Sequence, residues 1–120
     1  MNELNLSEAD KVEVVVLVDN YTDTLMESTH NAKRSPICPP RAPFAEHGLS
    51  CLVKVFSGAE EYHVLLDTGH SSICITHNID FLKIDAKKIE YIVISHGHVD
   101  HVEGLMAVLQ RTGKQVQLRP

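Results

Sequence analysis

Residues 12–18 read Val-Glu-Val-Val-Val-Leu-Val, and this short run of branched apolar side chains narrows the choice of fold before any other feature. β-Branched residues favour extended backbone, and an apolar run of this length is typical of a buried strand and not of a helix. The sequence therefore predicts a fold that is built around a β-sheet.

Further strands and helices are predicted along the chain, which has no internal repeat. Four more segments have the length and apolar character of strands: 50–56, 62–66, 89–94 and 115–118. Residues 57–60 would turn the first two of these into a hairpin. A short helix or turn is expected over 85–88, and a longer helix over 103–111 that ends at Gly113. This order of elements predicts an α/β fold with a mixed sheet and flanking helices.

A cluster of metal-binding side chains directly follows the strand that is predicted over 89–94. His96, His98, Asp100 and His101 place three imidazoles and one carboxylate within six residues. His96 and His98 continue at strand spacing and would project to the same side, while Asp100 and His101 would follow in a turn. These ligand types favour a transition metal over calcium or magnesium.

Four ligands in this order can serve two neighbouring ions, one held by His96 and His98 and the other by Asp100 and His101. Two metal ions lower the pKa of a bridging water and polarise a carbonyl or phosphoryl oxygen of the substrate, which is hydrolytic chemistry. The alternative is a group of exposed histidines at the start of a helix. One or two Zn²⁺ ions are expected first, with iron, manganese or cobalt as the other candidates.

The motif at 96–101 resembles the signature of the metallo-β-lactamase superfamily, and Asp-Thr-Gly at 67–69 resembles the same triplet at a strand end in that family. Three other segments are similar to the branch of 7,8-dihydropterin-6-yl-methyl-4-(β-D-ribofuranosyl)aminobenzene 5'-phosphate synthase-like proteins: 16–23, 45–50 and 95–98. The resemblance extends over nearly the whole chain, from about residue 9 to residue 120.

This resemblance implies an αββα sandwich that is made of two similar halves. The 120 residues amount to about half of that fold, so residues 1–120 are expected to be a partial domain, its N-terminal half, with the C-terminal half absent. The family's remaining metal ligands come from the second half, and the residues after His101 include neither His nor Asp. Within the part that is present, Asp100 is expected to be catalytic, because it would hold a metal and help to orient the nucleophile.

A long segment rich in proline, residues 19–47, separates the first two predicted strands. Its four prolines between 36 and 43 exclude a helix or a central strand, so an extended loop is expected. This loop is either a plain surface connection or a flap over the metal site. In the second case it would carry Asn20, Tyr21 and His47 towards the substrate.

Asp67 follows the strand predicted over 62–66, where a carboxylate is costly to bury unless it is hydrogen-bonded or paired. Spacing alone leaves two interpretations: Asp67 shapes the turn before Gly69, or it accepts a hydrogen bond from a metal-binding histidine. The family resemblance favours the second interpretation, in which Asp67 fixes the tautomer and orientation of that histidine.

Charge and composition limit the partners and the compartment. The chain has 11 basic and 16 acidic residues, a net charge of -5 and no basic cluster, so nucleic acid is not expected as a partner. No signal peptide and no membrane span is expected, which predicts a cytoplasmic protein that acts on a small molecule. Cys38, Cys51 and Cys74 lack paired spacing and are expected to be reduced, partly buried thiols that pack and do not bind metal.

Three functions are compatible with the sequence. The first is a metal-dependent hydrolase that uses a metal-activated water on an ester, a phosphoester or a related substrate. The second, implied by the resemblance, is pterin-related synthase (transferase) chemistry on a phosphoribosyl-aminobenzene substrate. The third is a truncated, non-catalytic metal-binding fragment, whose apolar face would associate with a second copy or with a partner chain that covers the missing half. The sequence leaves open whether this chain alone is an enzyme.

Overall fold

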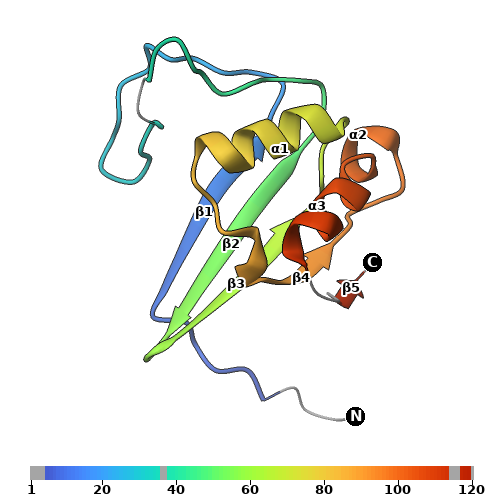
Figure 1. The fold of residues 1–120 in the computed structure, drawn as a ribbon. Helices are drawn as coiled ribbons and strands as arrows, with labels where there is room; N and C mark the ends of the chain where they lie inside the picture. Colours follow the sequence, from blue (N-terminus) through green and yellow to red (C-terminus); the bar gives the residue numbers. More distant parts are fainter. Residues whose placement is uncertain (1–4, 36–37, 114–116, 120) are drawn as a thin grey trace.

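The computed structural model describes residues 5–35, 38–113 and 117–119, which form one five-stranded sheet with helices against one face (Figure 1). The strands lie side by side in the order in which they occur in the sequence: β1 (Lys11–Val18), β2 (Ser50–Ser57), β3 (Glu60–Leu66), β4 (Ile89–Val93) and β5 (Gln117–Arg119). β1, β2 and β3 pair antiparallel, whereas β3, β4 and β5 pair parallel. The sheet is therefore mixed, as the sequence predicts.

The predicted strands form close to their expected bounds, and a tight turn at Gly58 and Ala59 joins β2 to β3. The strand expected over 115–118 is observed as β5, although residues 115 and 116 lie outside the described residues. The short helix expected over 85–88 is the 3₁₀-helix η1 (Ala86–Lys88). The helix expected over 103–111 is observed as α3 (Leu105–Thr112), which ends at Gly113 with a left-handed φ of 62°.

Two helices were not predicted. α1 (Ser72–Phe81) forms between β3 and η1, and the short α2 (Val99–Val102) begins inside the histidine motif, where a turn was expected. The sequence of α1 is rich in β-branched residues, which lower helix propensity. The helix is stabilised instead by the Ser71 hydroxyl, which accepts a hydrogen bond from the Cys74 N–H, and by the burial of its apolar face.

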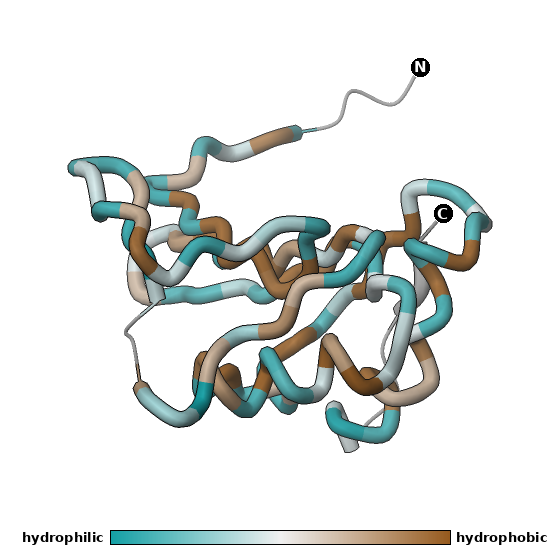
Figure 2. Tube along the Cα trace, turned by 90° about the horizontal axis from the view of Figure 1, so that it is seen from above, coloured by the Kyte–Doolittle hydropathy of each residue, from teal (hydrophilic) through white to brown (hydrophobic). Residues whose placement is uncertain are grey.

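The core lies between the sheet and a single layer of helices. Leu17, Leu52, Leu65 and Ile92 come from four neighbouring strands, and each is no more than 2% exposed. Ile75 of α1 and Val108 of α3 belong to the same buried cluster. Figure 2, seen from above, shows the helical turns on one side of the strands. The arrangement supplies two of the four layers of the predicted αββα sandwich.

The opposite face of the sheet is open and apolar. Val12, Val14 and Val16 of β1 are 53–59% exposed on it. Because side chains alternate along a strand, the pairing register of β1 to β4 places Ser57 and Glu60 on this open face at the hairpin end, and all other residues that it places there are uncharged. These uncharged residues are Val12, Val14, Val16, Cys51, Val53, Val55, Tyr62, Val64, Leu66, Tyr91 and Val93. No described helix covers these side chains. Sheets with such faces are normally packed against another layer.

The segment between β1 and β2 has no helix or strand among its described residues, apart from a bridge between Cys38 and Arg41. Buried Asn78 of α1 fastens this loop: its Oδ1 accepts from the Phe44 N–H at 2.8 Å, and its Nδ2 donates to the carbonyl oxygens of Phe44 and Leu17. The loop therefore runs beside α1 and is tied to β1 (Figure 1).

All three cysteines are free. Cys74 is buried and Cys51 is half-buried, but Cys38 is exposed, which corrects the expectation of partial burial. In the part of the chain that the structure describes, no helix has the length and apolar character needed to cross a membrane.

Candidate metal centre

The candidate site forms where two parallel strands end next to each other. Leu66 and Val93 are paired at the ends of β3 and β4, and the Asp67 N–H donates to the Val93 carbonyl at 2.8 Å. Parallel strands bring their carboxyl ends to the same edge of a sheet, so the residues after β3 and after β4 meet there. Asp67 and the histidine motif are therefore neighbours in space, although 29 or more positions separate them in sequence.

The motif residues leave β4 and enter α2. His98 is the N-cap of α2, and Asp100 and His101 lie in its single turn. The ring centroid of His96 lies 4.7 Å from that of His98 and 4.2 Å from that of His101. Asp100 Oδ2 is 3.4 Å from His101 Nε2. The structure thus brings all four predicted ligands together at one end of the sheet.

Asp67 is fully buried and anchors this end of the sheet. Its Oδ1 accepts a hydrogen bond from the Ser95 N–H at 2.7 Å, and its Oδ2 accepts from the Ser95 hydroxyl at 2.7 Å. The same Oδ2 lies 2.7 Å from His101 Nδ1. Burial alone would raise the pKa of Asp67, but these hydrogen bonds outweigh it and lower the pKa.

An ionised Asp67 sets the tautomer of His101. A carboxylate can only accept hydrogen bonds, so His101 Nδ1 must carry the proton that faces Asp67 Oδ2. In the neutral ring, Nε2 then has a free lone pair, and this nitrogen faces the Asp100 carboxylate. This is the arrangement that metal-binding histidines usually have.

Asp100 is a second carboxylate in an ionised state. Partial removal from water would raise its pKa, but its own backbone N–H and the imidazoles of His101, His47 and His98 lower the pKa overall. His47 Nε2 lies 3.2 Å from Asp100 Oδ2, and the His47 side chain is 81% exposed. Of the three loop residues predicted to approach the site, the structure therefore places His47 beside a predicted metal ligand.

Among the described residues, the other two loop residues make their hydrogen bonds within the loop and not with the motif. The backbone N–H of Asn20 donates to Asp19 Oδ1 at 2.8 Å, and the Tyr21 hydroxyl lies 3.4 Å from Asp23 Oδ2. The Tyr21 side chain is 69% exposed. Their contact with a substrate stays a prediction.

The segment that carries His47 is fastened to the site by residues that the sequence did not single out. Glu46 Oε1 accepts from the N–H groups of His70 and Ser71 at 2.9 and 2.8 Å, and Glu46 Oε2 accepts from the Ser71 hydroxyl at 2.6 Å. The Leu49 N–H donates to the Asp100 carbonyl at 3.3 Å. Two features of the sequence could have pointed to Glu46: it directly precedes His47, and it lies in the segment 45–50 that resembles the synthase-like branch.

Two glycines allow the backbone to approach the site closely. A Cβ on Gly48, whose φ is 153°, would lie 2.6 Å from the Asp100 carbonyl oxygen. A Cβ on buried Gly104 would overlap the Thr68 carbonyl oxygen. Thr68 in turn donates from its N–H and its hydroxyl to the His101 carbonyl at 2.8 and 3.1 Å. The turn after β3 and the turn after α2 therefore lie in direct contact.

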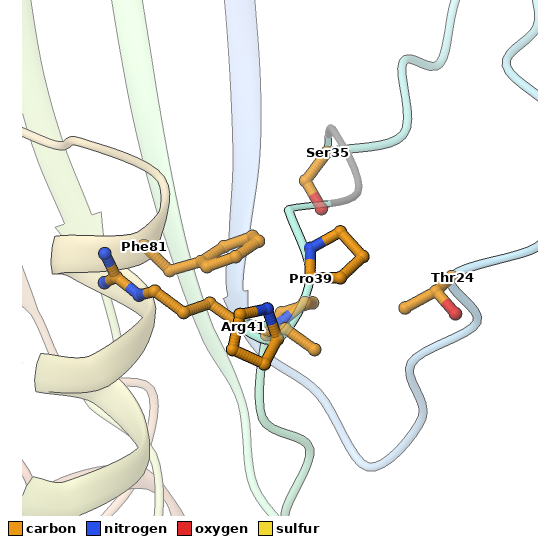
Figure 3. Close-up of a pocket in the computed structure, with 8 residues that line it drawn as sticks. Thr24, Ser35, Pro39, Arg41 and Phe81 are labelled. Atoms are coloured by element: carbon orange, nitrogen blue, oxygen red, sulfur yellow. The ribbon is translucent and has the colours of Figure 1, made fainter.

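A cavity of about 220 Å³ lies elsewhere, between the loop and the C-terminal end of α1 (Figure 3). Pro39, Arg41 and Phe81 contribute to its wall. α1 has ten residues and is therefore about 15 Å long. Ser71 at its other end belongs to the Glu46 contact, so the cavity is separate from the histidine cluster.

The residue types of the cluster fit a transition metal, since imidazole nitrogens and a carboxylate oxygen are its usual ligands. The tautomer of His101 also fits, because its Nε2 is left free. In the described ranges, however, no group of three or more His, Cys, Asp or Glu side chains is already arranged to hold an ion. His96 and His98 are exposed, so their rings have room to rotate into place.

Comparison with known proteins points to one family. The model of the metallo-beta-lactamase superfamily matches residues 47–119, which is more than half of the chain. The 7,8-dihydropterin-6-methyl-4-(beta-D-ribofuranosyl)-aminobenzene-5'-phosphate synthase of Methanocaldococcus jannaschii is 27% identical over 115 residues, which are 96% of this chain and 34% of that protein. An uncharacterized protein of the same organism is 36% identical over 67 residues, 56% of this chain and 24% of its own length. The chain thus spans about a third or less of these two relatives.

Solved structures with partial similarity include the Rm3 metallo-beta-lactamase, at 27% identity and a TM-score of 0.43 over 69% of this chain and 36% of that one. A second is the MIM-2 metallo-beta-lactamase, at 25% identity and a TM-score of 0.45 over 60% of this chain and 26% of that one. A variant of a flavo di-iron protein from Thermotoga maritima has 26% identity and a TM-score of 0.44 over 58% of this chain and 18% of that one.

Proposed function

The chain belongs to the metallo-beta-lactamase superfamily, and we propose that its histidine cluster is the metal-binding part of a hydrolytic centre that acts on an ester, a phosphoester or a related small molecule. The observation that carries this proposal is the buried Asp67 carboxylate, which lies 2.7 Å from His101 Nδ1 and leaves Nε2 free. Burying a carboxylate costs free energy, and a role in orienting a metal ligand would explain why Asp67 is buried here.

His96, His98, Asp100 and His101 would hold the metal, with Zn²⁺ as the first candidate and iron, manganese or cobalt as the others. A bound metal lowers the pKa of a coordinated water and polarises the carbonyl or phosphoryl oxygen of the substrate. Ser95 and Asp67 keep His101 in the tautomer that can donate its Nε2 lone pair. Asp100 stays ionised because its pKa is lowered, so it can hold a metal and accept a hydrogen bond that helps to orient the nucleophile.

A second candidate function is synthase chemistry on a phosphoribosyl-aminobenzene substrate. It is favoured by the relative from M. jannaschii, which is named for such an activity and aligns with 96% of this chain. Fold and metal ligands do not distinguish hydrolysis from group transfer, because the same site type supports both.

A third candidate is a metal-binding chain without catalysis of its own. The chain spans 34% of the first relative's length, and its open apolar sheet face would associate with a second copy or with a partner chain. Metal binding with no turnover would favour this function over the other two.

Metal content and turnover of the purified chain test these candidates together. After loading with Zn²⁺ and removal of free metal, inductively coupled plasma mass spectrometry should find one or two ions per chain. His98→Ala should lose metal retention, whereas His30→Ala should keep it, because His30 is an exposed loop histidine outside the cluster. Hydrolysis of p-nitrophenyl acetate and bis-p-nitrophenyl phosphate would then be measured. Equal metal retention by wild type and His98→Ala would refute the proposed site.

A further inference from the structure

Two imidazole nitrogens approach one carboxylate oxygen at the edge of the histidine cluster. His47 Nε2 lies 3.2 Å from Asp100 Oδ2, and His101 Nε2 lies 3.4 Å from the same oxygen. Both distances are longer than the about 2.7–2.9 Å that is typical of a charge-assisted N–H···O hydrogen bond. An ordinary hydrogen-bonded His–Asp pair would be expected to lie closer together.

The separations match those between ligands of one ion. Zinc binds imidazole nitrogen and carboxylate oxygen at about 2.0–2.2 Å in a tetrahedral arrangement, so two of its ligand atoms are about 3.3–3.6 Å apart. The distances from Asp100 Oδ2 to His47 Nε2 and to His101 Nε2 are close to that range. Ligands of a shared ion direct their lone pairs at the ion and not at one another, so they stay farther apart than a hydrogen-bonded pair.

The backbone around His47 is held at this place independently of the His47 side chain. The carboxylate of Glu46 accepts three hydrogen bonds from His70 and Ser71, and the Leu49 N–H donates to the Asp100 carbonyl. Gly48 packs directly on that same carbonyl. The His47 ring itself is 81% exposed, so it can turn without disturbing the fold.

We propose that His47 is an additional metal ligand, which joins Asp100 and His101 from the loop side of the site. This role rests on the function proposed above, because it requires a metal at the cluster. It would bring into the site a ligand that lies outside the 96–101 motif and about 50 positions before it in the sequence. The loop end at 46–49 would then be part of the metal centre and not only a cover over it.

Cobalt spectroscopy of a cysteine variant tests this placement directly. In His47→Cys loaded with Co²⁺, a thiolate in the coordination shell would produce a thiolate-to-cobalt charge-transfer band in the near ultraviolet. His30→Cys is the matched control, since it adds a thiol to the same loop away from the cluster and should give no such band beyond that of wild type. Absence of the band in His47→Cys would overturn the proposal.

Zinc affinity gives a second readout. His47→Gln keeps a neutral polar side chain beside Asp100 but removes the imidazole, so zinc affinity, measured by competition with a chromophoric chelator, should fall about tenfold or more. Unchanged affinity in His47→Gln would reject His47 as a ligand. If His98→Ala still loses the metal in that case, the proposed function stands; if wild type binds no zinc or cobalt, both proposals fail.

Discussion

Replacing Asp67 by Asn isolates the effect of one buried charge on the metal site. Asn keeps the shape of the side chain and tolerates the positive φ of 57° at this position, so the backbone should not change. The Ser95 N–H can still donate a hydrogen bond to the amide oxygen. The amide NH₂ group, however, would then face the N–H of His101 Nδ1, and two hydrogen-bond donors cannot pair.

A change in the tautomer of His101 would relieve this contact between two donors. If the proton of His101 moves from Nδ1 to Nε2, Nδ1 can accept from the amide, but Nε2 loses the lone pair that the metal needs. Loss of such an orienting partner typically costs about 10- to 100-fold in metal affinity, which is about 1.4–2.7 kcal/mol. The metal-free chain should also lose about 1–3 kcal/mol of unfolding free energy, because hydrogen bonds to a charged group are replaced by weaker ones.

Zinc affinity by chelator competition and urea unfolding of the metal-free chain measure the two effects. The ¹⁵N chemical shifts of His101 would report its tautomer in each variant. Asp85→Asn is the control, since Asp85 is exposed and its Oδ1 accepts from the Lys87 N–H, a contact that an amide oxygen can keep. If Asp67→Asn bound zinc as tightly as wild type with Nε2 still unprotonated, Asp67 would not control the tautomer and the reasoning would be wrong.

Three further predictions concern stability, association and thiol reactivity. Gly104→Ala should lower the unfolding free energy by about 1–3 kcal/mol, because the new Cβ would overlap the Thr68 carbonyl; an unchanged urea midpoint would contradict this. Val14→Lys puts a charge on the open sheet face and should shift the chain towards monomer in sedimentation velocity, and an unaltered distribution would show that this face makes no contact between copies. Burial raises the pKa of the Cys74 thiol to about 11, so at about pH 8 this thiol should stay protonated and react slowly with a disulfide reagent, whereas exposed Cys38 should react first. The reaction of Cys74 should become faster only at higher pH. Fast modification of Cys74 at about pH 8 would contradict its burial.

β1, β2, β3 and β4 could be predicted from the sequence because each contains a short apolar run. The run at 12–18 and the turn at Gly58 needed no knowledge of distant contacts. α1 could not be predicted in this way, since its β-branched residues disfavour a helix and its stability comes from Ser71, from packing and from Asn78. Tertiary contacts outweigh local propensity there.

In the candidate site, too, features that depend on local sequence could be predicted and features that depend on distant contacts could not. Spacing within 96–101 was enough to group the four predicted ligands, because they are close in sequence. Glu46 and Ser95 were not predicted, because their roles depend on which chain segments meet at the ends of β3 and β4. Ser95 directly precedes the motif, yet nothing in its own pattern indicated that both its N–H and its hydroxyl bind Asp67.

The topology of the sheet has a consequence for the order of folding. β2 and β3 are joined across two residues, whereas β1 reaches β2 only by closing the segment 19–49. Closing a loop of about 31 residues instead of two costs about 2.4 kcal/mol more in chain entropy. β1 should therefore dock after the β2–β3 hairpin has formed, and the amide hydrogens of β1 should exchange with solvent before those of β3 when the native protein opens locally.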